Sequence, residues 1–384
     1  MNALALRMLF GDRAKYLGII LGVTLAALLM SNQITIFVGL MSRTRSNFQD
    51  LPTADLIIAD PATEFIEDVK PLADTDVQRV RGVRGVEWAV PVLRTPLKVR
   101  LPGGKFRTCI VVGLDDATLI GGPARMHAGS IEALRSPDTV VIDRLDAEKL
   151  LSVVMPDGSR RVPGVGDEVE INDRRVRIAA VSDNPRPFIS QPIIYTTFSR
   201  ARLMAPPERR TVSFVLAGLA EGASLESVRS ELAEQTGLAA YTRRGFCWRT
   251  IGYYLRNTGI PVNFGVTVLL GCVVGIAITG QTFYLFILDN LKNLAALKAM
   301  GANNRQMVRM VLLQAGLVGV QGYAIGIGLT ALFFVAYFGT DLAFTVHWEV
   351  LAITAAAIVA VMAVAVAASL RRVVSVQPAL VFRA

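Results

Sequence analysis

The side chains with the clearest chemical character lie in segment 289–309, where cations stand among leucines. The cations are Lys292, Lys298, Arg305 and Arg309. Ala, Leu, Lys and Met favour helix, and Gly301 suits the left-handed residue that ends one. Asn303, with Gln306 three residues later, matches a capping box that opens the next helix. The segment therefore predicts a short charged helix, suited to contact with a soluble partner.

Residues for catalysis or metal binding are scarce. The sequence contains no Gly-x-x-x-x-Gly-Lys-Ser/Thr loop, no His-Glu-x-x-His, no Cys-x-x-Cys and no Gly-x-Ser-x-Gly. Its two histidines, His127 and His347, suit surface or interface positions better than a metal site or a triad. We therefore expect a chain that is not an enzyme and holds no metal or cofactor of its own.

Four apolar runs explain where the charged segment must lie. Hydrophobic residues make up 52% of the 384 residues, too many for an ordinary soluble protein of this length. The runs are 16–41, 262–288, 310–338 and 350–370. Each reaches the roughly 20 residues that a helix needs to cross about 30 Å of hydrocarbon. The first exceeds the roughly 7–15 apolar residues of a signal peptide, so we expect it to stay as a span.

The distribution of charge predicts the orientation of these spans. Outside the block 43–258, all Lys and Arg residues fall at the N-terminus, in segment 289–309 or at the C-terminus. Four spans place these three regions on one side of the membrane, and the positive-inside rule makes that side cytoplasmic. The block itself, with 30 Lys and Arg against 27 Asp and Glu, is then external. The net charge of +9 reports topology and does not indicate nucleic acid binding.

The block 43–258 is predicted to be a mixed α/β domain, with two lobes. Alternating residues 97–101 and the run 106–114 flank Pro-Gly-Gly and predict a hairpin. A second hairpin is expected around Asn172-Asp173. Further strands are expected at 140–142, 193–195 and 212–216, and helices at 74–81, 145–152 and 224–236.

Small residues four positions apart recur in the spans. They form three pairs: Gly18 with Gly22, Gly271 with Gly275, and Gly322 with Gly326. Such spacing lets helices approach closely, and the three later spans carry no ionisable Asp, Glu, Lys, Arg or His. Together these features favour a tightly packed bundle or dimer over a water-filled pore.

Three features of the block leave alternatives open. Paired arginines such as Arg160-Arg161 suit either anionic partners or a solvated strand face, and interspersed carboxylates favour the latter. Cys109 and Cys247 could form a disulfide or remain free. Trp248, Tyr253 and Tyr254, just before the second span, suit the membrane interface.

The order of one span, a large external domain and three spans resembles the MacB/FtsX superfamily of ABC transporter permeases. Residues 297–302, Leu-Lys-Ala-Met-Gly-Ala, are similar to the cytoplasmic loop of that family, and 377–383 to its Pro-x-x-x-Phe/Leu-Arg tail. Residues 166–171, followed by a hairpin, are also similar. In the residues of this loop and in the lack of a fused ATPase, the chain resembles the DevC branch. Asn293 departs from the family, whose members often carry an acidic residue there.

This resemblance implies three regions: a cytoplasmic N-terminus with the first span at 1–42, a MacB-like periplasmic domain at 43–258, and an FtsX-like permease domain at 259–384. It implies a coupling loop for a separate cytoplasmic ATPase, which would hold ATP and magnesium. The coupling residues are expected to be Asn290, Leu291, Lys292, Asn293, Leu294, Leu297, Lys298, Met300, Gly301 and Arg305. Because Leu291, Leu294, Leu297 and Met300 recur every third residue, they spiral around the helix and predict contacts on more than one face.

The family further implies a homodimer in the bacterial inner membrane, with both termini cytoplasmic. As an expectation, the chain drives export of a lipid-like or amphipathic substrate through a periplasmic adaptor and an outer-membrane duct. Two alternatives remain: an FtsX-like signalling subunit that controls a cell-wall hydrolase, and a lipoprotein-extraction permease.

Overall fold

The computed structural model describes residues 2–49, 54–154, 158–184, 191–337 and 342–375. The chain divides into two compact units, each considered on its own. One comprises Met1–Leu40 with Gly259–Ala384, and the other Met41–Thr258. We refer to them as the membrane unit and the α/β unit.

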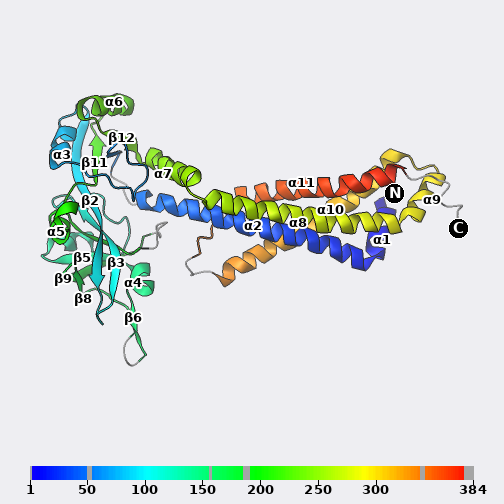
Figure 1. Cartoon of the computed structure of the whole chain (residues 1–384), viewed down its shortest axis with the longest axis horizontal. Coiled ribbons are helices and arrows are strands. Elements are labelled where there is room, and N and C mark those ends of the chain that lie inside the picture. The colour runs from blue at the N-terminus through cyan, green and yellow to red at the C-terminus, as the bar shows by residue number, and fades with distance from the viewer. Residues whose placement is uncertain (1, 50–53, 155–157, 185–190, 338–341, 376–384) are drawn as a thin grey trace. The chain divides into compact units, whose positions relative to one another are not determined.

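The membrane unit consists of helices. They are α1 (Asn2–Gly11), α2 (Arg13–Gln49, which continues into the α/β unit), α8 (Ile260–Asp289), α9 (Leu291–Ala299), α10 (Asn304–Ala336) and α11 (Trp348–Ser375). Within them, Arg13–Thr44, Ile260–Asp289, Asn304–Ala336 and Trp348–Arg371 are long and apolar enough to cross a membrane. The long helices run side by side, with α11 packed on both α8 and α10 (Figure 1). The prediction of four transmembrane helices is confirmed.

Helix α9 is bounded by the local signals that the sequence contains. Gly301 takes φ +99°, and the amides of Gly301 and Ala302 donate to the carbonyls of Lys298 and Leu297. Such bonds satisfy carbonyls that a helix end leaves unpaired. In the capping box that opens α10, Asn303 Oδ1 accepts from the Gln306 amide at 2.8 Å and Gln306 Oε1 from the Asn303 amide at 3.0 Å. Both predicted caps are confirmed.

The α/β unit is built on one large sheet. Its strands are β1 (Leu56–Ala59), β2 (Val86–Arg100), β3 (Phe106–Leu114), β4 (Met126–Ala128), β5 (Thr139–Asp143), β8 (Glu168–Ile171), β9 (Arg174–Ser182), β10 (Ile193–Thr197), β11 (Phe214–Leu219) and β12 (Ala239–Thr242). A separate small hairpin joins β6 (Val153–Val154) to β7 (Arg160–Arg161). The helices are α3 (Asp74–Arg81), α4 (Arg144–Lys149), α5 (Phe198–Met204), α6 (Leu225–Thr236) and α7 (Arg243–Asn257), with short 3₁₀ turns η1 (Ile131–Arg135) and η2 (Pro207–Arg209).

The long strand β2 belongs to both halves of this sheet. Its first half pairs with β11, which continues through β1 to β12. Its second half pairs with β3 on one side and β8 on the other. Because β8 also pairs with β9, the strands β2, β3, β10, β5, β9 and β8 close into a ring around an apolar core. The mixed α/β fold is confirmed.

Most predicted elements are present, with shifted ends. Both hairpins form, and Asn172 and Asp173 take φ +46° and +64°, as a two-residue turn between twisted strands requires. The strand predicted at 212–216 begins at Phe214, because Val212 instead forms an isolated bridge with Leu72. The helix predicted at 145–152 is α4 and ends at Lys149.

The two cysteines of the α/β unit, Cys109 and Cys247, are buried in different apolar clusters and are not joined in a disulfide. Burial raises the pKa of the Cys109 thiol to about 12, and the nearby Asp146 adds to the shift. At neutral pH this thiol stays protonated and behaves as a small apolar side chain.

Candidate coupling helix and helix-packing site

The inner face of α9 is part of the core of the membrane unit. Leu294 is 3% exposed and belongs to a buried cluster with residues of α1, α2, α8, α10 and α11. Leu297 is 8% exposed and joins Ala5 of α1 and Met310 of α10 in a second cluster. These leucines therefore hold α9 against the spans.

The outer face of α9 is available to a partner. Lys292 and Asn293 are exposed, and the Met300 side chain is 76% exposed. Leu291 lies half-buried between the two faces. An exposed methionine flanked by polar groups is a suitable contact for another protein, because its flexible side chain adapts to an apolar surface.

Polar bonds fix both ends of this helix. The Asn290 side chain donates to the Phe286 carbonyl at 2.9 Å and accepts from Asn293 at 3.2 Å. At the other end, the Lys298 ammonium donates to the Val374 carbonyl of α11 at 3.1 Å. Arg305 lies beyond Gly301 on the first turn of α10 and is exposed.

These positions correct one expectation. We expected Leu294 to be one of the coupling residues that contact the ATPase. Its side chain is instead buried in the apolar core of the membrane unit, so it does not form part of the outer surface of α9. The same holds for Leu297. Among the expected coupling residues, those that remain on the surface are Lys292, Asn293, Met300, Gly301 and Arg305.

A further polar contact joins the start of α2 to the end of α8. The Lys15 ammonium forms ion pairs with Asp12, at 2.8 Å, and with Asp289. The hydrogen bond from Lys15 lowers the pKa of the Asp12 carboxyl. We did not predict the ion pair between Lys15 and Asp289 from the sequence. The sequence does contain a hint of it, since Asp12 and Asp289 are the only acidic residues in segments 1–42 and 289–309.

The six predicted packing glycines all lie where α2 meets α8 or α10. A Cβ atom on Gly22 would stand 2.8 Å from Ile278 and Thr279 of α8, and one on Gly275 would stand 2.6 Å from Ala26. On α10, Gly322 and Gly326 would meet Val23 and Ala27 of α2, each at 2.6 Å. A Cβ atom on Gly18 would stand 3.2 Å from Thr282, and one on Gly271 would stand 3.3 Å from Met30, both tighter than usual. These glycines therefore pack α2 within its own chain.

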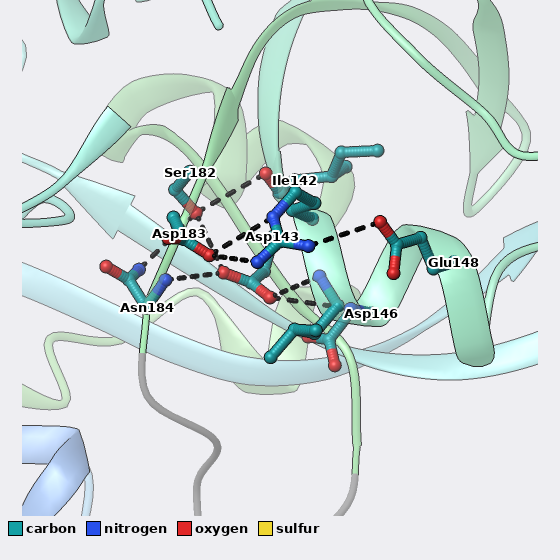
Figure 2. A network of polar contacts seen from close by, with 9 residues as sticks. Ile142, Asp143, Asp146, Glu148, Ser182, Asp183 and Asn184 are labelled. Carbon is teal, nitrogen blue, oxygen red and sulfur yellow. Dashed lines mark hydrogen bonds and ion pairs between the residues drawn. The ribbon is translucent and has the colours of Figure 1, made fainter. Parts of the chain in front are cut away.

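The α/β unit contains a buried polar network at the carboxyl ends of β5 and β9 (Figure 2). The Asp143 carboxylate accepts from the amides of Leu145 and Asn184, and from the Ser182 hydroxyl at 3.4 Å. Nearby, Asp146 accepts from the Ile193 amide at 3.0 Å. Burial raises the pKa of Asp143, which the hydrogen bonds only partly offset. These contacts cap the start of α4 and hold the ends of β5 and β9 together, which indicates a structural role.

A second cluster of buried polar side chains joins α7 to the sheet. Arg94 of β2 lies 4.0 Å from the Glu67 carboxylate, and the Tyr254 hydroxyl of α7 lies 3.5 Å from the same carboxylate. Tyr254 is only 7% exposed, so it lies in the core of the α/β unit and the expectation of a membrane-interface tyrosine is wrong there. Burial raises the pKa of Glu67, while Arg94 acts to lower it.

In the ranges that the structure describes, no group of three or more His, Cys, Asp or Glu residues is placed to hold a metal ion. What the arrangement provides is a surface helix anchored in a packed bundle of spans.

Two family models match this chain. The MacB-like periplasmic core domain matches residues 16–235, and the FtsX-like permease C-terminal domain matches residues 265–378. The first model alone covers more than half of the chain.

Relatives named as ABC transporter permeases agree with this match. The chain is 23% identical over 313 residues to the uncharacterized ABC transporter permease Rv2563 of Mycobacterium tuberculosis, which covers 81% of this chain and 79% of the relative. It is 24% identical over the same length to the permease Rv0072 of that species, with the same coverage.

Among solved structures, the periplasmic region of MacB from Actinobacillus actinomycetemcomitans is 13% identical, with a TM-score of 0.37, covering 54% of this chain and 95% of that one. The extracellular domain of YknZ from Gram-positive bacteria is 16% identical, with a TM-score of 0.35, covering 50% and 98%. From the family models and the four spans, the chain belongs to the MacB/FtsX-type ABC transporter permeases, the membrane subunits that work with a partner ATPase.

Proposed function

We propose that this permease relays the ATP-driven motion of a separate ATPase through α9 to its α/β unit. The observation that carries the proposal is the division of α9 into two faces. Leu294 and Leu297 anchor it in the core shared by the spans, while Met300 and Lys292 remain exposed. A force applied to the outer face is therefore passed directly to α1, α8, α10 and α11.

The proposal extends to the assembly. In it, two copies of the chain lie in the bacterial inner membrane with both termini and α9 in the cytoplasm, and the α/β unit in the periplasm. ATP and magnesium bind the ATPase. Export of a lipid-like or amphipathic substrate then proceeds through a periplasmic adaptor and an outer-membrane duct, as in the DevC branch. The uncharged, glycine-packed spans support transmission of motion over formation of a polar channel.

The proposal is tested by Met300→Asp. A carboxylate at the centre of an apolar contact must lose its hydration, so we expect co-purification of the cognate ATPase to fall about tenfold or more. Because Met300 is exposed in this chain, the thermal unfolding midpoint of the permease alone should stay unchanged.

The matched control is Val346→Asp, which introduces the same charge at a side chain that is 50% exposed in the link between α10 and α11. It should leave ATPase binding at the wild-type level. Normal ATPase binding and ATP-dependent transport by the Met300→Asp variant would show that α9 is not the docking element.

A further inference from the structure

A long apolar groove runs between α10 and α11 in the membrane unit. Its volume is about 550 Å³. Gly316 and Gly319 of α10 and Ala363 of α11 lie along it, and their lack of bulk leaves it open. Leu312 and Leu370 line the end nearer α9.

The length of the groove along the helices matches the thickness of one membrane leaflet. Tyr323 lines its other end, and the tyrosine hydroxyl donates to the Leu351 carbonyl of α11 at 2.8 Å, which joins the two helices there. From Leu312 to Tyr323 the helix rises about 16 Å, close to half of the roughly 30 Å of hydrocarbon in a bilayer. A lipid acyl chain therefore matches its length and its polarity.

Three arginines stand at the open end. One hollow, lined by Arg305, Val308 and Arg309, shares Leu312 with the groove. Another, lined by Val308 and Arg371, shares Leu370 with it. All three arginines are exposed, and within the described parts of the chain none of their guanidinium groups forms an ion pair.

The segments that carry the three arginines have no acidic residue to neutralise them. Segments 290–340 and 350–384 contain no Asp or Glu. The two acidic residues nearest in sequence on this side, Asp12 and Asp289, are both engaged by Lys15. The counter-ion of the three arginines must therefore come from outside the chain.

We propose that this groove binds an anionic phospholipid, with an acyl chain between α10 and α11 and the phosphate held by Arg305, Arg309 and Arg371. Basic pockets between membrane helices suit such headgroups, and guanidinium groups bind phosphate through paired hydrogen bonds. A zwitterionic phospholipid has the same acyl chains and phosphate but no net charge, so it compensates the three arginines less.

The test offers the full-length chain, stripped of lipid in detergent, an equimolar mixture of dioleoyl phosphatidylglycerol and dioleoyl phosphatidylcholine. Native mass spectrometry then gives the ratio of the two bound lipids, which have identical tails. We expect wild type to favour phosphatidylglycerol. In the Arg309→Gln/Arg371→Gln variant the ratio should fall about 25-fold, about fivefold for each basic side chain removed. Inorganic phosphate at millimolar concentration should not displace the lipid.

Two matched controls separate the headgroup site from the groove. Arg7→Gln/Arg13→Gln removes two exposed cations from the same side and should leave the ratio within about twofold of wild type. Gly316→Leu adds a bulky side chain to a residue that lines the groove, at a Cβ position with nothing within 4 Å, and should abolish binding of both lipids. Gly328→Leu, equally open but outside the groove, should bind both normally.

Three outcomes would overturn the proposal. If the Arg7/Arg13 variant lost its preference for phosphatidylglycerol to the same extent, general surface charge would explain the preference. Unchanged binding by Gly316→Leu would leave the groove without a lipid. Conversion of a wild-type dimer to monomer by Gly316→Leu would assign the groove to a second copy of the chain.

Discussion

At the scale of single residues, Glu67 and Arg94 form a charge pair that is largely buried in the α/β unit. Their side chains are 15% and 11% exposed, and they join the segment before α3 to β2 and, through Tyr254, to α7. Among the residues that the structure describes, none forms a hydrogen bond with Glu67 Oε1, so this oxygen depends on Arg94 for compensation. The two partners are not equivalent, because a buried carboxylate can take up a proton whereas a guanidinium stays charged.

We therefore predict that Glu67→Gln is the more harmful change. It leaves Arg94 buried without a counter-ion, which costs about 3–5 kcal/mol and lowers the unfolding midpoint by about 6–20 °C in a domain of this size. Thermal unfolding of the purified chain at pH 7 measures this. A midpoint within 2 °C of wild type would contradict the idea that the pair is needed.

The opposite change, Arg94→Met, should give a pH-dependent loss. Without Arg94, the pKa of the buried Glu67 rises further above the ordinary value. A raised pKa in the folded state means that the folded chain binds the proton more tightly, so stability is greatest at low pH and falls as the pH rises through that pKa. The deficit relative to wild type should thus be larger at pH 8 than at pH 5. A deficit independent of pH would show that Glu67 does not titrate there.

At the scale of elements, the glycines of the membrane unit set how closely α2 packs. They are not interchangeable with other glycines of the same helices. Gly326 stands against α2, where a Cβ would lie 2.6 Å from the Ala27 Cβ and 2.9 Å from the Thr24 carbonyl oxygen. Gly328, two residues later, faces open space. The same substitution at these two positions therefore separates packing from helix propensity.

We predict that Gly326→Val destabilises the bundle by about 1–3 kcal/mol, since a new side chain must push α2 and α10 apart. Gly328→Val should change the unfolding midpoint by no more than the difference in helix propensity. The measurement is thermal unfolding of both variants in one detergent. Equal midpoints for the two would mean that α2 does not pack closely at Gly326.

Local signals in the sequence predicted the helices, strands and turns well. They did not predict which strands pair when the strands are far apart in the chain. The turn at Asn172-Asp173 and the caps at Gly301 and Asn303 depend on residues within four positions, so their types predict them. The pairing of β8 with β2 depends on strands far apart in the chain, which alternation alone does not specify.

The candidate site shows the same division. An apolar residue at every third position of α9 gives no single stripe, so the pattern could not tell buried Leu294 from exposed Met300. Likewise, aromatic residues before a span have one sequence signature whether they face lipid headgroups or, like Tyr254, a domain core.

At the scale of the whole molecule, the proposed topology places the exposed surface of α9 and that of the α/β unit on opposite sides of the membrane. The chain is suited to testing this by cysteine labelling, because Cys109 and Cys247 are buried and Cys272 is half-buried in a span. New cysteines at exposed positions will therefore dominate the signal.

We predict that Glu221→Cys, on the surface of the α/β unit, reacts with a membrane-impermeant maleimide in spheroplasts, and that Met300→Cys reacts only after the membrane is opened. The parent chain is the control for the native thiols. Labelling of Met300→Cys in intact spheroplasts would reverse the proposed orientation.

The two-sided character of α9 has an evolutionary consequence. Its inner leucines share cores with Leu9, Met307 and Met310, so a change there must be matched by changes in the spans of the same chain. The exposed residues Lys292, Asn293 and Met300 lie outside these cores, so the protein that binds them constrains which residues are accepted there. Across related permeases, the inner residues of this short helix should therefore covary with residues of the spans in the same chain. Its outer residues should covary with residues of the partner protein.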